Sequence, residues 1–265
     1  MKIGFIGLGN MASAMIGGFL KQGIAAPGEL LGSAKTLATR TKMAEKFGIT
    51  VCETNSQVAA ASDVLILAVK PVFLAEVIEE VRRQVRPDTL VISVAAGKTL
   101  DFLREAFGDA KVRLVRVMPN TPALVGEGCT GVCFGEGVSQ EQQEFALKLM
   151  NAFGKAYAVP ERLMDTVGAV SGSSPAFVFL FLEALADGAV EGGMPRKQAY
   201  EFAAQAVLGS AKLMLETGKH PGELKDMVCS PGGTTIAGVR VLEEQGLRAA
   251  VMDAVKATIE KTKLL

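Results

Sequence analysis

The chain has 265 residues, a length that suits one large domain or two ordinary ones. Hydrophobic residues make up 49% of it and charged residues 21%, a composition typical of a folded globular protein and not of a disordered chain. The 28 basic and 28 acidic side chains cancel, so nothing in the charge balance indicates nucleic acid or an anionic membrane surface as a partner.

The N-terminal residues do not resemble a targeting segment. Met1 and Lys2 lead straight into a predicted strand and a glycine loop, without the regions of a signal peptide. The most apolar run, Ala176 to Leu182, is far shorter than the roughly 20 residues that cross a bilayer. We therefore expect a cytoplasmic protein with no membrane partner.

Short apolar runs alternate with segments of helical period through the first half of the chain. The expected elements, in order, are a strand at Ile3–Gly7, a helix at Met11–Gln22, a strand at Glu29–Ser33, a polar helix ending at Phe47, a strand at Val64–Val69, a helix at Val72–Val85, a strand at Leu90–Val94, a helix at Leu100–Phe107 and a strand at Arg113–Met118. Two further strands, near Cys129–Phe134 and Tyr157–Val159, flank a helix at Gln140–Phe153. Such alternation predicts an α/β fold: a doubly wound, mostly parallel Rossmann sheet.

Strand signals stop after Pro160, and the rest of the chain reads as an all-helical C-terminal domain. The expected helices are Ala176–Gly192, Pro195–Gly218, Pro221–Val228, Thr235–Gln245 and a last one from Leu247. The first of these is apolar on every side, which predicts burial all round. The domain boundary is placed accordingly: a dinucleotide-binding domain at 1–160 and a helical substrate-binding and dimerisation domain at 161–265.

A glycine fingerprint follows the first predicted strand and opens the first helix. Gly7 allows a tight turn, Gly9 lets the backbone approach a pyrophosphate, and Ala12 permits close packing of helix on strand. The positive end of the helix dipole favours the phosphates. The expected cofactor-binding segment is Ile6, Gly7, Leu8, Gly9, Asn10, Met11 and Ala12. The alternative is a glycine turn without a ligand.

The second strand ends without the carboxylate that usually binds the ribose of NAD. Ser33 and Lys35 stand there instead, and Arg40 follows one turn later. Hydroxyls and cations suit the 2′-phosphate of NADPH, so NADPH is the preferred cofactor and NADH a possible one. In the other interpretation, Lys35 and Arg40 are simply the solvated start of a helix.

Three more segments lie at the carboxyl ends of predicted strands, where open parallel sheets bind ligands. Their residues are Ala68, Val69, Lys70 and Pro71; Ala95, Ala96 and Gly97; and Asn120. Small residues and prolines there let the backbone approach a flat ring. Ordinary strand-exit turns have the same composition.

A second candidate site precedes a C-terminal helix. Ser230, Gly232, Gly233, Thr234 and Thr235 present successive amides and hydroxyls at a helix N-terminus, an arrangement that binds anions. A simple capping turn explains the same residues. The four cysteines match no zinc pattern, so no metal is expected; Cys129 and Cys133 are either a redox or metal pair or, as we favour, free thiols in a buried strand.

Taken in order, the segments GLGNMA, AVKP, SVAAG, RVMPNTP, SGSSPAF, ALADGAV and LKDMVCSPGGTTI resemble the pyrroline-5-carboxylate reductase family over nearly the whole chain. The resemblance implies reduction of 1-pyrroline-5-carboxylate to L-proline, the final step of proline biosynthesis. It implies that Ser33 and Asn55 contact the cofactor, along with AVKP and AAG. It further implies that the substrate carboxylate lies on the SPGGTT amides and that Thr235, the catalytic candidate, reaches the ring nitrogen.

The resemblance also implies a homodimer that forms through interleaved C-terminal helices and can assemble further into a decamer. The sequence departs from some relatives at Ser174 and Phe177, where they have Gly and Tyr. Two other functions stay open. A 3-hydroxyacid or 6-phosphogluconate-type dehydrogenase would need a lysine on the first C-terminal helix, which has none. A non-enzymatic NADP-binding regulator would need no anion site at SPGGTT.

Overall fold

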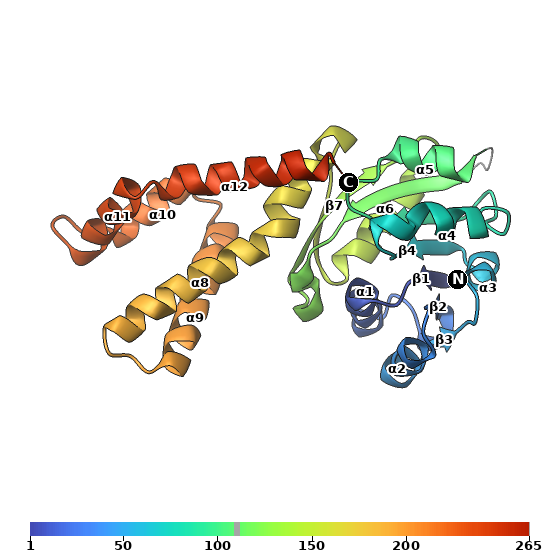
Figure 1. Cartoon of the computed structure of the whole chain (residues 1–265), viewed down its shortest axis with the longest axis horizontal. Helices are drawn as coiled ribbons and strands as arrows, with labels where there is room; N and C mark the ends of the chain where they lie inside the picture. The colour runs from blue at the N-terminus through green and yellow to red at the C-terminus, as the bar shows by residue number, and fades with distance from the viewer. Residues whose placement is uncertain (109–111, 265) are drawn as a thin grey trace. The chain divides into compact units, whose positions relative to one another are not determined.

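The computed structural model describes residues 1–108 and 112–264. Its internal contacts divide the chain into two compact units (Figure 1). Unit 1 comprises residues 1–173 together with 258–265, and unit 2 comprises residues 174–257. Each unit is described by itself.

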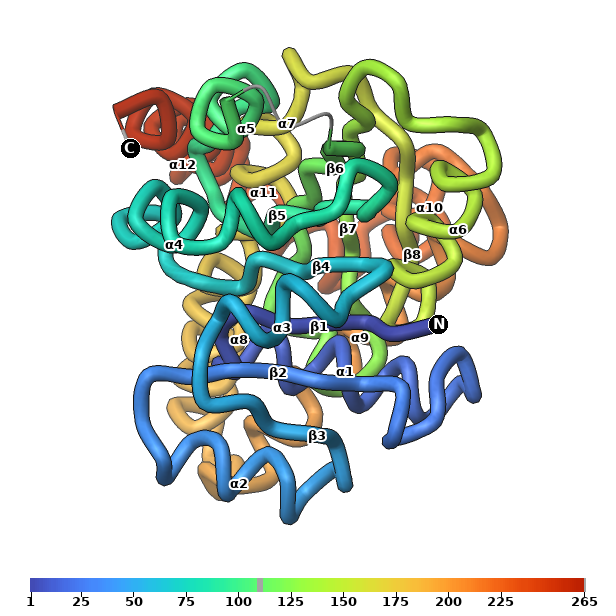
Figure 2. The backbone as a smooth tube through the Cα atoms, turned by 90° about the vertical axis from the view of Figure 1, so that its right-hand side faces the viewer, coloured from blue at the N-terminus to red at the C-terminus, as the bar shows by residue number. Residues whose placement is uncertain are grey.

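Unit 1 is built on an eight-stranded sheet of order β3-β2-β1-β4-β5-β6-β7-β8, whose first six members Figure 2 shows stacked in that sequence. The strands are β1 (Ile3–Ile6), β2 (Leu30–Ser33), β3 (Thr50–Val51), β4 (Val64–Leu67), β5 (Leu90–Ser93), β6 (Arg113–Met118), β7 (Gly128–Phe134) and β8 (Gly154–Ala158). Strands β1 to β6 pair in parallel, β7 is antiparallel to β6, and β8 is parallel to β7. The predicted mostly parallel Rossmann sheet is confirmed.

Helices cover both faces of this sheet. The central strands β1, β4 and β5 are therefore buried on both sides. One hydrophobic cluster contains the helices α1 (Asn10–Lys21), α2 (Leu37–Phe47) and α6 (Gln140–Asn151). The other contains α3 (Asn55–Ala61), α4 (Leu74–Val81) and α5 (Leu100–Phe107). Figure 1 shows α4 and α5 across the strands from α1 and α2. Because β1 to β6 pair in parallel, their carboxyl ends lie at the same edge of the sheet.

A short strand and a short helix of unit 1 are among the elements that were not expected from the sequence. Strand β3 has just two residues, too few to show an alternating pattern. Helix α3 is short and starts with a capping box, in which Thr54 and Gln57 each satisfy a backbone amide of the other. This Thr-x-x-Gln pattern was the available signal for α3.

Unit 1 continues past the boundary expected at residue 160. Arg116 on β6 is 2% exposed, and its guanidinium contacts Glu161 at 3.3 Å and Asp165 at 3.0 Å. Short helical turns at Glu161–Leu163, Met164–Val167 and Gly168–Ser173 lie in this segment. The buried arginine needs these carboxylates as partners, which ties residues 161–173 to the sheet.

Unit 2 is all-helical, as predicted. Its helices are α8 (Ser174–Glu191), α9 (Arg196–Thr217), α10 (Pro221–Val228), α11 (Thr234–Glu244) and the greater part of α12 (Leu247–Thr262). Pro195 is the N-cap of α9 and not its first helical residue, and Gly218 ends the helix in the left-handed conformation, at φ 63°.

Helix α8 was expected to be buried on every side, but within the single chain it is largely exposed. Phe179 is 62% and Leu180 67% exposed, and Ala186 is the buried residue of the helix. The described residues include one helical stretch, 161–191, that is long and apolar enough to cross a membrane by length and composition alone, and 11% of its most apolar window is buried. The sequence analysis counted the shorter uninterrupted apolar run 176–182 and did not single out this stretch. Unit 2 is too small to cover this helix by itself.

Candidate active site

The glycine fingerprint forms the turn between β1 and α1. Gly7 has a φ of 93°, and a Cβ built on it would lie 2.6 Å from the carbonyl oxygen of Ala68. Its amide donates to the carbonyl of Ser33 at 3.0 Å, which joins the ends of β1 and β2. Gly9 is the N-cap of α1, and a Cβ there would meet open space. Ala12, in the first turn of α1, is fully buried. The backbone geometry and burial of these small residues are those that the fingerprint requires, and their contact with a dinucleotide stays a prediction.

A cavity of about 600 Å³ opens in front of this turn, and we call it the lysine groove. It is lined by Gly7, Leu8, Gly9, Asn10, Ser13, Ala34, Lys35, Thr36, Thr39, Lys42, Met43, Lys46, Ala68, Val69, Lys70, Phe73 and Leu124. Lysines are its charged lining residues, and none of the described residues that line it is acidic. Cations beside free amides at a helix N-terminus provide a strong site for phosphate groups.

Lys42 and Lys46 were not among the residues predicted from the sequence. Together with Thr39 and Met43 they lie on one face of α2, at positions 39, 42, 43 and 46. That i, i+3, i+4, i+7 spacing was the available signal, because it aligns side chains along a helix. Its direction toward the glycine turn depends on how α2 packs beside α1.

A second cavity, of about 460 Å³, lies on the other side of the ends of β1 and β2, and we call it the glutamate groove. Its lining residues are Ile6, Gly7, Ala34, Lys35, Glu53, Thr54, Asn55, Val69, Phe73, Glu76, Val77 and Glu80. Lys35 and Phe73 line both grooves. The two grooves differ in charge, because three carboxylates surround this one.

Ser33 and Asn55, which the resemblance implies as cofactor contacts, form a hydrogen bond with each other. The Ser33 hydroxyl, at the end of β2, donates to Asn55 Oδ1 at 2.7 Å. Ser33 is 1% exposed, whereas Asn55 lines the glutamate groove. Asn55 is therefore the member of this pair that is open to the groove.

Lys35 lines both grooves, whereas Arg40 is not among the lining residues of either. Its guanidinium donates to the carbonyl oxygens of Cys52 and Glu53, at 3.5 Å and 3.1 Å, and its Nε is buried. The backbone turn after β3 presents carbonyls that need donors, and Arg40 supplies them. This geometry supports a structural role for Arg40, and its contact with a 2′-phosphate stays a prediction.

The other predicted strand-end segments lie at the same edge of the sheet. Ala68, Val69 and Lys70 line the lysine groove, and Pro71 begins a short 3₁₀ helix, Pro71–Phe73. Ala95, Ala96 and Gly97 follow the neighbouring strand β5, with Ala95 buried and Gly97 at φ 73°.

Asn120 follows β6, and its side chain braces two neighbouring segments. It donates to the carbonyl of Ser171 at 2.9 Å and accepts from the amide of Cys129 at 2.8 Å. These two bonds hold the end of β6 against β7 and the 168–173 turn.

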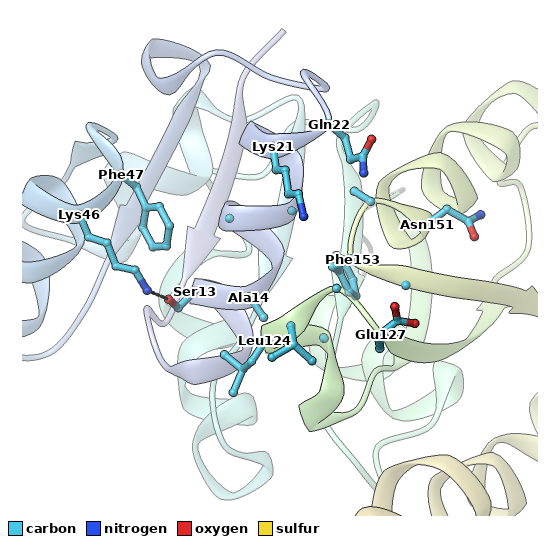
Figure 3. A pocket seen from close by; sticks show the side chains of 17 residues that line it. Ser13, Ala14, Lys21, Gln22, Lys46, Phe47, Leu124, Glu127, Asn151 and Phe153 are labelled. Carbon is cyan, nitrogen blue, oxygen red and sulfur yellow. Dashed lines mark hydrogen bonds between the residues drawn. The ribbon is translucent and has the colours of Figure 1, made fainter. Parts of the chain in front are cut away.

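Figure 3 shows a further cavity, of about 530 Å³, on the other side of α1. Lys46 reaches across its rim to the Ser13 hydroxyl at 3.3 Å. Leu124 and Glu127 also line it, but none of the residues predicted to bind cofactor or substrate does. The chemistry expected at the strand ends therefore does not lie here.

Unit 2 contains the segment that the sequence predicts to bind an anion. Ser230 lies in the loop between α10 and α11, its carbonyl accepts from the Gly233 amide at 3.0 Å, and Gly232 has a φ of 71°. Gly233 is the N-cap of α11 and makes no side-chain capping bond. Thr234 and Thr235 are the first two helical residues. Gly233 is the N-cap, so Thr235 does not cap α11, and Thr234 and Thr235 are exposed at the start of the helix.

Strand β7 carries two free cysteines, of which Cys133 is buried and Cys129 is partly buried. Burial raises the pKa of Cys129 and Cys133 above the ordinary value, and the Glu161 carboxylate raises that of Cys133 further. Both are free, and no group of three or more potential metal ligands occurs within residues 1–108 and 112–264. A protonated thiol is a poor nucleophile and a poor metal ligand, which agrees with free thiols rather than a reactive pair.

Comparisons with known proteins cover the whole chain. Residues 161–265 match the family model described as pyrroline-5-carboxylate reductase dimerisation, and residues 2–97 match that described as NADP oxidoreductase coenzyme F420-dependent. The pyrroline-5-carboxylate reductase of Escherichia coli is 49% identical over 264 residues, covering 100% of this chain and 98% of the relative.

Two solved structures extend this similarity to the fold. A pyrroline-5-carboxylate reductase from Coxiella burnetii superposes with a TM-score of 0.92 at 36% identity, over 99% of this chain and 97% of the other. The Plasmodium falciparum pyrroline carboxylate reductase with NADP bound gives 0.89 at 32% identity, over 100% and 97%. From its glycine turn to its C-terminal SPGGTT turn, this chain belongs to the pyrroline-5-carboxylate reductase family.

Proposed function

We propose that this chain reduces 1-pyrroline-5-carboxylate to L-proline with a nicotinamide dinucleotide, the final step of proline biosynthesis. Similarity over the full length to a reductase of that name is the observation that carries the proposal. The two candidate sites supply what the reaction needs: a phosphate-binding groove in unit 1 and an anion site in unit 2.

The dinucleotide supplies the hydride, which its nicotinamide C4 donates to the C=N carbon of the cyclic imine. The residues of the chain bind and orient the reactants. The amides of residues 232–235 hold the substrate carboxylate, together with the Ser230 hydroxyl. The Thr235 hydroxyl oxygen accepts a hydrogen bond from the protonated ring nitrogen and keeps the C=N carbon in place. A protonated imine is already electrophilic, so positioning supplies most of the catalysis.

Cofactor binding is assigned to unit 1. The amides at the start of α1 and the lysines of the lysine groove hold the phosphates, and Lys35 is the cation at the end of β2. Ser33 occupies the position at the end of β2 where NAD enzymes usually have a carboxylate. These features support NADPH as the preferred cofactor, with NADH also accepted.

Helix α8 supports assembly into a homodimer through the C-terminal helices, and of such dimers into a decamer. Phe179 and Leu180 are large apolar side chains that a folded chain rarely leaves in water, and a partner's helices would cover them. Association of this kind is consistent with a cytoplasmic enzyme. Light scattering at micromolar concentration tests the dimer: a mass near the 27.8 kDa of one chain would contradict it.

The activity is tested by oxidation of NADPH upon addition of 1-pyrroline-5-carboxylate. We expect turnover with this imine and none with pyruvate or 3-hydroxyisobutyrate. The residues Ser174–Glu191 of α8 contain no lysine to act as acid and base, which disfavours a hydroxyacid dehydrogenase. Activity confined to a hydroxyacid would refute the proposal. Dinucleotide binding without turnover of any of these substrates would instead favour a regulator.

A further inference from the structure

The glutamate groove contains a chain of three hydrogen-bonded side chains. The Ser33 hydroxyl donates to Asn55 Oδ1 at 2.7 Å, and Asn55 Nδ2 donates to Glu80 Oε2 at 2.7 Å. The three residues come from the end of β2, the first residue of α3 and the last turn of α4. Of these, Glu80 has no part in the catalytic and binding roles assigned above.

Glu80 decides which way round the Asn55 amide lies. An ionised carboxylate accepts hydrogen bonds and cannot donate them, so the Asn55 nitrogen has to face it. The amide oxygen then faces β2, where buried Ser33 donates its proton. With Ser33 alone the amide could lie either way, because a hydroxyl both donates and accepts.

This orientation matters because the ribose of a bound dinucleotide lies at the end of the second strand. The Asn55 oxygen on that side is an acceptor with a second lone pair. The 2′-hydroxyl of NADH can donate to it, whereas the ionised 2′-phosphate of NADPH offers further acceptors and repels it. The amide therefore opposes the preference that Lys35 supplies.

We infer that Glu80 is a positioning residue: it holds the Asn55 amide with its oxygen toward the ribose and so limits the preference for NADPH over NADH. The inference rests on the proposed use of both dinucleotides. In Glu80→Gln the new amide can donate to Asn55 Oδ1 instead of accepting. Asn55 can then turn over, bond to Ser33 through one Nδ2 hydrogen and offer the other to the 2′-phosphate.

The experiment measures equilibrium dissociation constants for NADPH and NADH, from nicotinamide fluorescence of the full-length protein without imine. We expect E80Q to raise the ratio of the NADH to the NADPH constant about tenfold, equivalent to about 1.4 kcal/mol. A hydrogen bond gained by a phosphate supports a change of that size. Glu80 is exposed, so the melting temperature should stay close to that of the unsubstituted chain.

Glu76→Gln is the matched control. Glu76 lies one turn earlier on α4 and lines the same groove, while the described hydrogen bonds of the Asn55 side chain go to Ser33 and Glu80. E76Q removes the same charge without releasing Asn55, so it should shift the ratio about threefold or less. An equal shift in both variants would show that charge repulsion alone is responsible and overturn the inference.

The Asn55→Ala background completes the test. If Glu80 acts through the amide, E80Q should shift the ratio there no more than E76Q does. A full shift without Asn55, or none in E80Q itself, would overturn the inference. The binding assay contains no imine, so a tenfold shift in a protein that fails to reduce 1-pyrroline-5-carboxylate would refute the proposed function and leave this inference standing.

Discussion

Gly7 and Gly9 stand two residues apart in the same turn, yet the structure predicts opposite consequences when each is replaced by alanine. At Gly7 the backbone has a φ of 93°, and a Cβ would lie 2.6 Å from the carbonyl oxygen of Ala68. At Gly9 the φ is −80°, and a Cβ would meet open space within the lysine groove. Gly7→Ala should therefore lower the stability of the fold, and Gly9→Ala should weaken binding of the dinucleotide.

For Gly7→Ala two costs add. The left-handed conformation costs an L-residue about 1–2 kcal/mol, and forcing a methyl group against backbone costs about 1–3 kcal/mol. The free energy of unfolding should therefore fall by about 2–5 kcal/mol. For a unit of this size the melting temperature should drop by roughly 5–15 °C.

For Gly9→Ala two smaller effects of opposite sign nearly cancel. Alanine reduces the entropy of the unfolded chain, a gain of about 0.4–1 kcal/mol, but it is a poorer N-cap than glycine. The melting temperature should change by less than roughly 3 °C. The new methyl group stands where a pyrophosphate approaches the backbone, so the dissociation constant for NADPH should rise roughly tenfold or more.

The assay is a thermal melt and an NADPH fluorescence titration on the same preparation of each variant. Loss of binding in Gly9→Ala at an unchanged melting temperature is the informative result. If Gly9→Ala binds NADPH like the unsubstituted chain, the glycine turn does not hold the dinucleotide. If Gly7→Ala melts like the unsubstituted chain, the close approach of Ala68 does not constrain the turn.

Three further predictions concern the second site, the coenzyme and the thiols. Thr235→Ala should lower turnover roughly 10- to 100-fold while the melting temperature and NADPH affinity stay unchanged, because the hydroxyl positions substrate and does not cap α11; a destabilised variant with full turnover would contradict this. Lys35→Glu should raise the Michaelis constant for NADPH about tenfold more than that for NADH. Arg40→Gln should leave the ratio of the two Michaelis constants unchanged and lower the melting temperature. If both variants change that ratio equally, Arg40 contacts the coenzyme as Lys35 does, and the assignment is wrong. Because burial raises the pKa of Cys129 and Cys133, both should be alkylated more slowly at pH 7 than in the denatured chain, with rates that rise as pH approaches their pKa, as followed by mass spectrometry; fast labelling of the folded protein at pH 7 would argue for a reactive pair.

Local patterns in the sequence were enough to predict the Rossmann sheet and the position of its glycine turn. The buried strands are continuous apolar runs. The turn after β1 has a φ of 93° at Gly7, a conformation that favours glycine, so the glycine in the sequence already indicates the turn. The same holds for the C-terminal helices, whose ends are marked by Pro221 and Gly218. These features depend on neighbours within a few residues, so one sequence suffices to predict them.

The direction of the long polar side chains was decided by tertiary structure. Arg40 and Lys42 are equally plausible phosphate ligands in the sequence, but carbonyls of the turn after β3 engage Arg40, and packing of α2 beside α1 places Lys42 in the lysine groove. Glu80 gave no signal at all, because its importance comes from an amide 25 residues away along the chain. The partners of a flexible side chain are set by which distant backbone and side-chain atoms the fold brings near it, and no local pattern records them.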